Sequence, residues 1–220
     1  DSIGRLYIAD RLNHRIRRVG LSTCSSLFNP TPAKLGFNDD HAQRVVLADM
    51  DNDGDRDVLV GKRSWRNQLY RNNGNGTFVA AALFDGGSDD TWDLVTGDVD
   101  NDGDLDIVTG NYGQPNRIYF NDGAGNFPTV VTFGAPNSTT NSVDLGDLDN
   151  DGDLDIVEGN LGQQDTIYRN NGSGNFGSAM PFGPATSNTR NARFGDVDGD
   201  GDLDLAVSTL GPNQIYLNDG

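Results

Sequence analysis

The feature that most constrains the fold of this 220-residue chain is an acidic nine-residue motif that occurs four times. "DMDNDGDRD" begins at Asp49, and "DVDNDGDLD", "DLDNDGDLD" and "DVDGDGDLD" begin at Asp98, Asp147 and Asp196, a spacing of 49 residues each time. A second pattern, seen as "YRNNGNGTF" and "YFNDGAGNF", follows each of the first two motifs at the same distance. A fixed period in the forties is the mark of a repeat architecture.

Each repeat contains four short apolar runs separated by Gly, Asn and Asp. In the first repeat they cover residues 45–48, 58–60, 69–70 and 78–84. No stretch shows helical periodicity, so we predict four antiparallel strands per repeat. Such units are typical of the blades of a β-propeller, and the chain holds about 4.5 of them. The sequence therefore predicts an all-β propeller of four-stranded antiparallel blades.

The strand order places the loops on two faces. The acidic loop joins the first strand of a blade to the second, and an Asn-Gly or Asp-Gly turn joins the third to the fourth. Both lie on one face, and the other connections lie on the opposite face.

Alternating aspartates around a central glycine predict a calcium loop. Unpaired carboxylates this close repel one another, and hard oxygen ligands suit Ca²⁺ better than soft metals. In the first loop we expect the side chains of Asp49, Asp51, Asp53 and Asp57 and the backbone carbonyl of Asp55 to bind the ion. The equivalent ligands are Asp98, Asp100, Asp102, Asp104 and Asp106; Asp147, Asp149, Asp151, Asp153 and Asp155; and Asp196, Asp198, Asp200, Asp202 and Asp204. About four Ca²⁺, one per loop, would stabilise the fold rather than take part in catalysis.

Two alternatives to this type of calcium loop fit the sequence less well. An EF-hand loop has the same opening but needs a bidentate acid at its twelfth position and helical flanks. The twelfth positions here are Val60, Thr109, Glu158 and Val207, and the flanks are strand-like. A solvated acidic turn could account for one copy, but not for four copies in phase.

At this point the residues resemble the FG-GAP/VCBS repeat. The resemblance rests on D-x-D-x-D-G-D-L-D before a short apolar strand and on I-Y-x-N-D-G-x-G-N-F, and it covers residues 41–220. It implies an integrin-α-like, calcium-binding propeller of the kind found in many secreted bacterial proteins. It also implies that the aspartates at the first, third, fifth and ninth loop positions bind calcium.

Residues 1–40 differ and are predicted to form a partial blade and a linker. "GRLYIADRLNHRIRRV" resembles the NHL repeat, in which a Y-x-A-D strand and an N-x-R-I strand are neighbours. Its arginines could form a basic strip or merely a charged blade edge: Arg5, Arg11, Arg15, Arg17 and Arg18. Residues 41–220 then form four blades, the last incomplete. We expect a fragment of a longer propeller that associates with further blades or another chain; the alternative is a five-bladed ring in which the N-terminal strands complete the last blade.

Composition restricts the partners. The net charge is −17, and residues 72–220 hold 4 Lys and Arg against 24 acids, which argues against nucleic acid and anionic membranes. No apolar run is long enough for membrane insertion. The single cysteine, Cys24, excludes an internal disulfide, and His14 and His41 have no nucleophile motif beside them, so we expect no enzyme.

The face opposite the acidic loops is the expected binding face. Exposed aromatic and amide groups there could contact a ligand: Trp65, Asn111, Tyr112, Gln114, Asn160 and Gln163. Alternatively, Trp65 and Tyr112 could pack between blades; Trp92 is expected in the core. Matching loop positions hold Arg63, Tyr112, Leu161 and Leu210, which is no repeated sugar platform.

These features favour a protein-recognition, adhesion or structural module. The alternatives are a glycan-binding lectin and the non-catalytic propeller of a secreted sugar-processing enzyme. A calcium loop of this type suits the millimolar calcium outside cells, so we expect an extracellular or cell-surface location.

Overall fold

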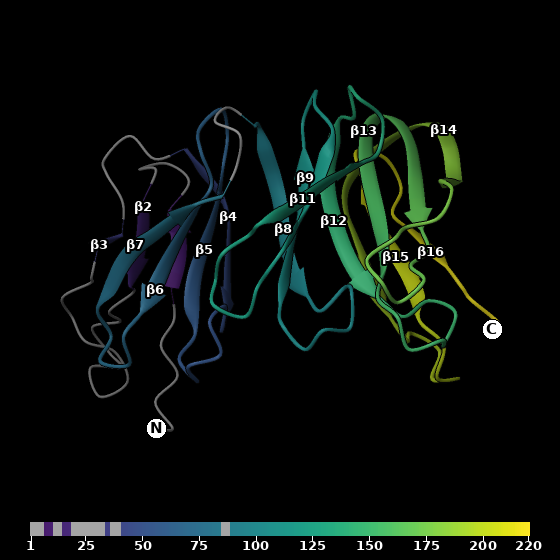
Figure 1. Ribbon diagram of the computed structural model, residues 1–220. Helices are drawn as coiled ribbons and strands as arrows, with labels where there is room; N and C mark the ends of the chain where they lie inside the picture. The colour runs from purple at the N-terminus through teal and green to yellow at the C-terminus, as the bar shows by residue number, and fades with distance from the viewer. Residues whose placement is uncertain (1–6, 11–14, 19–33, 36–40, 85–88) are drawn as a thin grey trace, which may run out of the picture.

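The computed structural model describes residues 7–10, 15–18, 34–35, 41–84 and 89–220. Its regular elements are all β-strands, and they form antiparallel sheets that stand side by side along the molecule (Figure 1). Within this part of the chain, no helix is long and apolar enough to cross a membrane. The predicted all-β class is confirmed.

Two sheets correspond to the first two repeats, and we call each such unit a blade. Blade 1 has the strand order β4-β5-β6-β7, with bounds Ala42–Ala48, Asp57–Lys62, Gln68–Asn72 and Phe78–Leu83. Blade 2 has the order β8-β9-β10-β11, with bounds Thr91–Gly97, Asp106–Asn111, Asn116–Phe120 and Thr129–Phe133. Each strand of blade 1 overlaps one of the apolar runs predicted for the first repeat, and both sheets have four antiparallel strands, so the strand number is confirmed here.

The last two repeats share one continuous sheet, which differs from the prediction. Its order is β12-β13-β14-β15-β16, with bounds Thr140–Gly146, Asp155–Tyr168, Met180–Gly195, Asp204–Thr209 and Gln214–Tyr216. Strand β13 combines the second and third strands of blade 3, and β14 combines its fourth strand with the first strand of blade 4. Register shifts around Gln163 mark where β13 bends.

The N-terminal strands form a separate sheet beside blade 1. Strands β1 (Tyr7–Asp10), β2 (Arg15–Arg18) and β3 (Lys34–Leu35) are antiparallel, so the Y-x-A-D and N-x-R-I segments are neighbours as expected. Among the described strands, β16 pairs only with β15, and the five-bladed alternative stays a prediction. Arg5, Arg11, His14, Cys24 and the side chains of Arg15, Arg17 and Arg18 lie outside the described residues.

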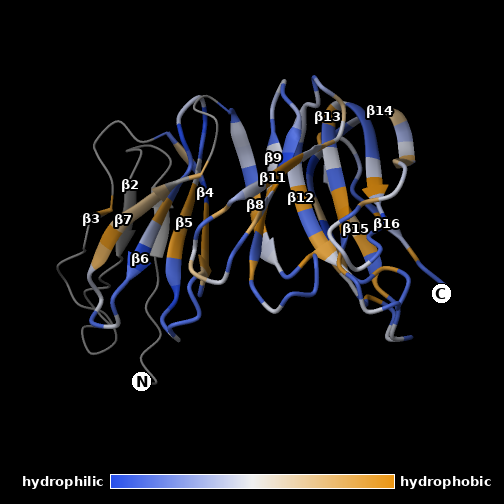
Figure 2. Ribbon diagram, viewed as in Figure 1, coloured by the Kyte–Doolittle hydropathy of each residue, from blue (hydrophilic) through white to orange (hydrophobic). Residues whose placement is uncertain are grey.

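The hydrophobic core lies between neighbouring blades. One cluster joins Leu59 and Leu69 of blade 1 to Leu94 and Ile107 of blade 2, and further clusters join blades 2 and 3 and blades 3 and 4. The second strand of a blade is buried on both faces, and β5 is buried along its whole length. Figure 2 shows this arrangement as hydrophobic stretches along the strands and hydrophilic residues in the loops at both ends.

Blades also meet so closely that one position requires glycine. A Cβ atom on Gly159 would lie 2.6 Å from the Thr189 side chain of the next blade. Glycine also occupies the matching positions 61 and 110. The repeat thus preserves a close contact between adjacent blades.

A polar contact joins the blades on the face opposite the acidic loops. Asn67 Nδ2 donates to Thr91 Oγ1 of the next blade at 3.0 Å, and Asn116 Nδ2 donates to Thr140 Oγ1 at 2.9 Å. In the third copy the roles differ, because Asp165 replaces the asparagine and its carboxylate accepts a hydrogen bond from Thr189 at 2.7 Å.

Candidate functional site

Each acidic loop is folded around its first aspartate. In the first loop, the Asp49 carboxylate accepts the backbone N–H groups of Asp53 and Gly54 at 3.2 and 2.8 Å. The same pair of bonds recurs at Asp98 and Asp147. Gly54 has a φ of +89°, a conformation that glycine adopts without steric cost. The resulting turn brings alternate carboxylates together.

Carboxylate oxygens converge in all four loops. Within each group the contributing oxygen atoms lie within 4.8 Å of one another: Asp49, Asp51 and Asp53; Asp98, Asp100 and Asp106; Asp147, Asp149 and Asp151; and Asp196, Asp198 and Asp204. Calcium–oxygen distances of about 2.3–2.6 Å allow one ion to join oxygens about 5 Å apart. The four groups therefore have the size of a calcium site.

The aspartate at the third loop position gives the sharpest test of whether a cation fits. Oδ1 of Asp51, Asp100 and Asp149 is buried, and no described residue donates a hydrogen bond to it. The other oxygen, Oδ2, lies 3.4 Å from Arg71 Nε in Asp51 and 2.9 Å from Arg169 Nη1 in Asp149. A buried polar atom without a partner costs about 1–3 kcal/mol, and more when it is charged. A cation is the partner that these oxygens lack.

The aspartate at the ninth loop position connects the acidic loop to the neighbouring turn. Asp106 is fully buried and accepts the backbone N–H groups of Val99 and Asn121 at 3.0 and 2.9 Å. Burial raises the pKa of the Asp106 carboxyl to about 6. Burial and the charge of Asp102 also raise the pKa of the Asp100 carboxyl. A divalent cation would favour the ionised forms and oppose both shifts.

The aspartate at the seventh loop position connects blades through its side chain. Asn52 Nδ2 of blade 1 donates to Asp104 Oδ1 of blade 2 at 2.7 Å, and Asn101 donates to Asp153 in the same way at 2.7 Å. Asn150 and Asp202 repeat the contact at 2.5 Å. These carboxylates are held by a neighbouring asparagine, which leaves the backbone carbonyl as the ligand that this position can offer. Sequence reasoning missed this contact between blades, although Asn recurs at the fourth position of three loops.

Glu158, which stands at the twelfth position of the third loop, is engaged elsewhere. Its carboxylate accepts hydrogen bonds from Ser138 Oγ, from Thr140 Oγ1 at 2.8 Å and from the Tyr168 hydroxyl at 2.8 Å. The EF-hand arrangement is therefore absent from the third loop.

The two aromatic candidates on the opposite face differ in surroundings. Trp65 is 50% exposed and its ring stacks on His41 at 6.2 Å between centroids. Tyr112 is 36% exposed and stacks on Trp92 at 5.1 Å. Both can be reached from solvent, so neither is packed away between blades.

The four amide candidates are engaged inside the protein. Asn111 and Asn160 are buried, and each donates to a backbone carbonyl and accepts a threonine hydroxyl. Gln114 Oε1 accepts the backbone N–H of Asp90, and Gln163 Oε1 accepts that of Thr139. These hydrogen bonds hold the loops in place, and contact of these amides with a ligand stays a prediction.

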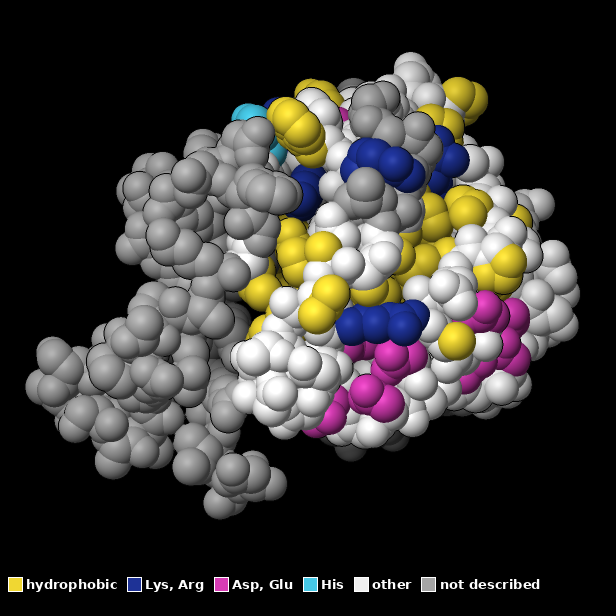
Figure 3. All heavy atoms as spheres, turned by 60° about the vertical axis from the view of Figure 1, so that its left-hand side comes forward, with side chains coloured by type: hydrophobic (Ala, Val, Ile, Leu, Met, Phe, Trp, Pro, Cys, Tyr) yellow, Lys and Arg dark blue, Asp and Glu magenta, His cyan; other side chains and the backbone are white. Residues whose placement is uncertain are grey.

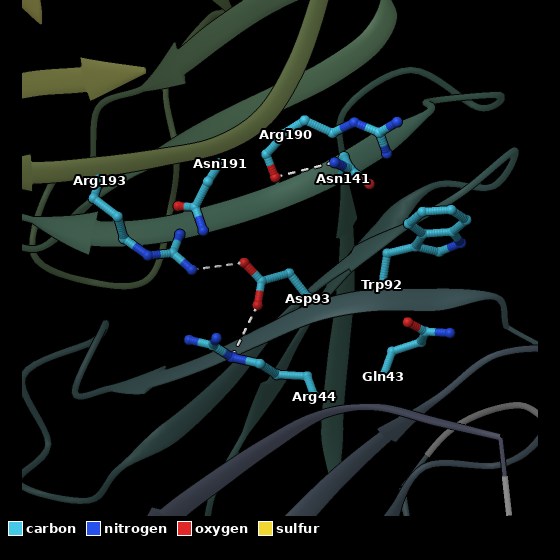
Figure 4. A pocket seen from close by; sticks show the side chains of 8 residues that line it. All are labelled: Gln43, Arg44, Trp92, Asp93, Asn141, Arg190, Asn191 and Arg193. Atoms are coloured by element: carbon cyan, nitrogen blue, oxygen red, sulfur yellow. Dashed lines mark hydrogen bonds and ion pairs between the residues drawn. The ribbon is translucent and has the colours of Figure 1, made fainter. Parts of the chain in front are cut away.

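Trp92 lies outside the hydrophobic clusters, which corrects the expectation that it packs in the core. It is half-buried, Arg63 lies 4.5 Å from the centre of its ring, and it lines a polar pocket of about 330 Å³. Figure 4 shows the side chains around this pocket: Gln43, Arg44, Trp92, Asp93, Asn141, Arg190, Asn191 and Arg193. They come from β4, β8, β12 and β14, the first strands of four blades, so we call it the axial pocket.

Most of the acidic side chains gather at one end of the molecule. Figure 3 shows Asp and Glu side chains gathered at the lower end, with Lys and Arg side chains above them. The acidic loops make up the first group. Arg44, Arg63 and Arg190 belong to the opposite end.

Comparison with known proteins identifies the repeat. The family profile described as the FG-GAP-like repeat matches residues 49–109, 98–158 and 159–207. No curated protein has a matching sequence. A solved structure of an Agrocybe aegerita lectin, described as specifically recognising non-reducing terminal N-acetylglucosamine, is 20% identical with a TM-score of 0.60 and covers 93% of this chain. A chain of the BBS1N complex with ARL6DN is 13% identical, with a TM-score of 0.48, covering 98% of this chain and 76% of that one.

The present chain spans 60% of the lectin's length. The matched repeats and the likeness to the lectin confirm the β-propeller fold. Neither comparison tests the NHL resemblance of residues 1–40, which stays a prediction.

Proposed function

This chain belongs to the FG-GAP-like repeat family, and from that membership we propose that it is a calcium-binding propeller that recognises a protein partner outside the cell. The acidic loops would bind about four Ca²⁺, and the face opposite them would bind the partner. We propose no reaction for it, because His41 stacks on Trp65 and the sequence has only one other histidine, His14.

The observation that carries the calcium assignment is the row of unpartnered carboxylate oxygens. Asp51, Asp100 and Asp149 repeat the same buried, unpartnered Oδ1 in three consecutive blades. An accidental acidic turn has no reason to bury the same oxygen three times. The ions would stabilise the hairpins and not touch the partner, because they sit on the other face.

The opposite face supports recognition of a protein more than of a repeated sugar. Trp65 and Tyr112 are exposed aromatic side chains among polar groups, the kind of residue that dominates protein interfaces. They are not repeated, since the positions matching Tyr112 hold Arg63, Leu161 and Leu210. Glycan binding remains the second candidate, because an exposed indole also stacks on sugars.

We propose an extracellular location from the affinity expected of the calcium loops. Exposed loops of this type fit the 10⁻⁴–10⁻³ M affinity range of extracellular calcium modules. Calcium at that concentration is available outside cells, so the loops would be filled there and not in the cytosol.

The test is a binding screen with calcium-loaded protein against a panel of extracellular protein domains and a glycan array, repeated in EDTA. We expect a protein ligand whose binding is lost in EDTA and weakened at least about tenfold by a Trp65→Ala, Tyr112→Ala double variant, as for interface anchors. Val79→Ala is the matched control, because Val79 is 61% exposed on the outer strand β7. Calcium-dependent binding of one sugar class without a protein ligand would replace the proposal by the lectin alternative.

A further inference from the structure

The axial pocket is lined by residues at which the pairing register between two strands of a blade shifts. In each blade the first strand has a bulge, and the extra residue is Gln43, Trp92, Asn141 or Arg190. Bulges redirect a side chain away from the ladder and are common beside binding sites. All four bulge residues line the axial pocket. The fold thus aims one side chain per blade at the axis.

The identity of these residues is not required by the fold. The four matching positions hold Gln, Trp, Asn and Arg, and the positions one residue later hold Arg44, Asp93, Ser142 and Asn191. The same backbone therefore accepts apolar, neutral and charged side chains here. A charge pattern at these positions reflects what the pocket does and not how a blade folds.

The pocket concentrates positive charge in an acidic protein. Residues 72–220 contain four basic residues, and two of them, Arg190 and Arg193, line this pocket. Arg44 brings the guanidinium groups to three, against the carboxylates of Asp93 and of Asp144, which lies near Arg193. The pocket therefore carries a net positive charge in a chain whose net charge is −17.

Two of the guanidinium groups have donors to spare. Asp93 is nearly buried and pairs with Arg44 Nε and Arg193 Nη2, both at 3.0 Å (Figure 4). Arg193 Nη1 also donates to Ser142 Oγ and to two backbone carbonyls, so most of this guanidinium is engaged inside the protein. Among the described residues, nothing bonds to the terminal nitrogens of Arg44 or to the side chain of Arg190.

We propose that the axial pocket binds an acidic side chain, Asp or Glu, of the partner protein. Guanidinium groups match a carboxylate with paired hydrogen bonds, and Arg190 supplies free donors, while the Arg44 guanidinium lies across the pocket beside Asp93 (Figure 4). Asn141 and Asn191 also line the pocket with amides that suit a peptide backbone. This inference rests on the recognition function proposed above and names its site and its ligand chemistry.

The test uses calcium-loaded protein and small probes. Blocked Gly-Glu-Gly is titrated while the tryptophan emission of the protein and the amide chemical shifts of the pocket residues are recorded. Blocked Gly-Gln-Gly serves as the neutral analogue, glucuronate as a carboxylate on a sugar, and glucose as its neutral control. We expect the Glu peptide to bind with a Kd of about 1–10 mM, as befits a single side chain, and at least about fivefold tighter than the Gln peptide.

Arg190→Gln is the decisive variant, because this exposed side chain has no partner to lose within the described structure. It should weaken the Glu peptide at least about fivefold, since a charged donor is removed. Arg56→Gln, which removes the same charge at an exposed position in the first acidic loop, should leave binding unchanged. Thermal melting of both variants in calcium confirms that they are folded.

Equal binding of the Glu and Gln peptides, or unchanged binding in Arg190→Gln, would overturn the inference. Binding of glucuronate in place of the peptide would overturn the choice of a protein side chain. If elemental analysis finds calcium and a partner is recognised while no probe binds, this inference fails and the proposed function stands. If the probe binds and no calcium is found, the proposed function fails instead.

Discussion

Replacing Thr140 by valine tests whether polar contacts between blades hold the propeller together. The Thr140 hydroxyl accepts a hydrogen bond from Asn116 of blade 2 and lies 2.8 Å from Glu158 Oε1 of its own blade. Glu158 is 1% exposed, and none of the ion pairs among the described residues includes it. Valine keeps the shape of threonine, so Thr140→Val removes the hydroxyl without opening a cavity.

Thr91→Val is a matched control. Thr91 occupies the same position in blade 2, where it accepts from Asn67 and donates to Asn111, but no carboxylate takes part. Losing this neutral contact should cost about 1–3 kcal/mol. The single hydroxyl proton of Thr140 is shared between Glu158 Oε1 and Asn160 Oδ1, so Thr140→Val loses a hydrogen bond to a buried carboxylate in place of the neutral one lost in Thr91→Val. A hydrogen bond to a charged group is worth about 1.5–3 kcal/mol against about 0.5–1.5 kcal/mol for a neutral one, so we expect Thr140→Val to cost about 1 kcal/mol more than Thr91→Val.

The assay is urea unfolding followed by tryptophan emission in saturating calcium, with thermal melting as a second readout. For a chain of this size, a difference of about 1 kcal/mol corresponds to about 2–4 °C in Tm. If Thr140→Val were no more destabilising than Thr91→Val, the buried carboxylate would not depend on this hydroxyl. The description of the contact between blades 2 and 3 would then be refuted.

Two further variants probe other parts of the structure. Gly172 has a φ of +77°, and a Cβ there would lie 2.7 Å from the Asp153 carboxylate. Gly172→Ala should therefore lower the free energy of unfolding in urea by about 1–2 kcal/mol from the backbone alone. Gly211→Ala, where the nearest atom is 3.6 Å away, should be nearly neutral, and equal costs of the two variants would contradict this prediction. Burial raises the pKa of the Asp165 carboxyl above 3.8, so the folded state holds the proton more tightly than the unfolded chain, and its contribution to stability is lost as pH rises from 3.8 through the folded pKa. Asp165→Asn, which restores the amide found at Asn67 and Asn116, should remove this slope and raise the unfolding free energy at pH 7; an unchanged slope in an unfolding series from pH 4 to 8 would contradict it.

The repeat predicts most of the architecture because its period fixes the strand number and the side on which each loop lies. Each blade 1 strand overlaps the apolar run predicted for it, and the aspartates at the first and third loop positions converge in all four copies. The alternation of small polar residues with glycine is a local pattern. A single repeat therefore contains everything that is needed to predict its acidic loop.

Contacts between blades cannot be deduced from one repeat. Asp104 resembles the other loop aspartates, yet Asn52 of the preceding blade holds its side chain. Asn111 has the sequence context of an exposed loop amide. Its side chain instead accepts a hydrogen bond from the threonine that stands 20 residues earlier, on another strand. Trp92 is apolar and lies on a strand, which predicts a place in the core, whereas a bulge turns it toward the axis. Bulges depend on the pairing register, which the composition of a strand does not specify.

The central claim is tested most directly by measuring bound calcium and melting temperature on the same sample. Elemental analysis after dialysis against millimolar calcium should find about four calcium ions per chain, one for each convergent group of carboxylates. EDTA should then remove them and lower the Tm markedly, because ligand binding to the folded state adds to its stability. A chain without bound calcium whose melting curve is the same in EDTA would contradict the account.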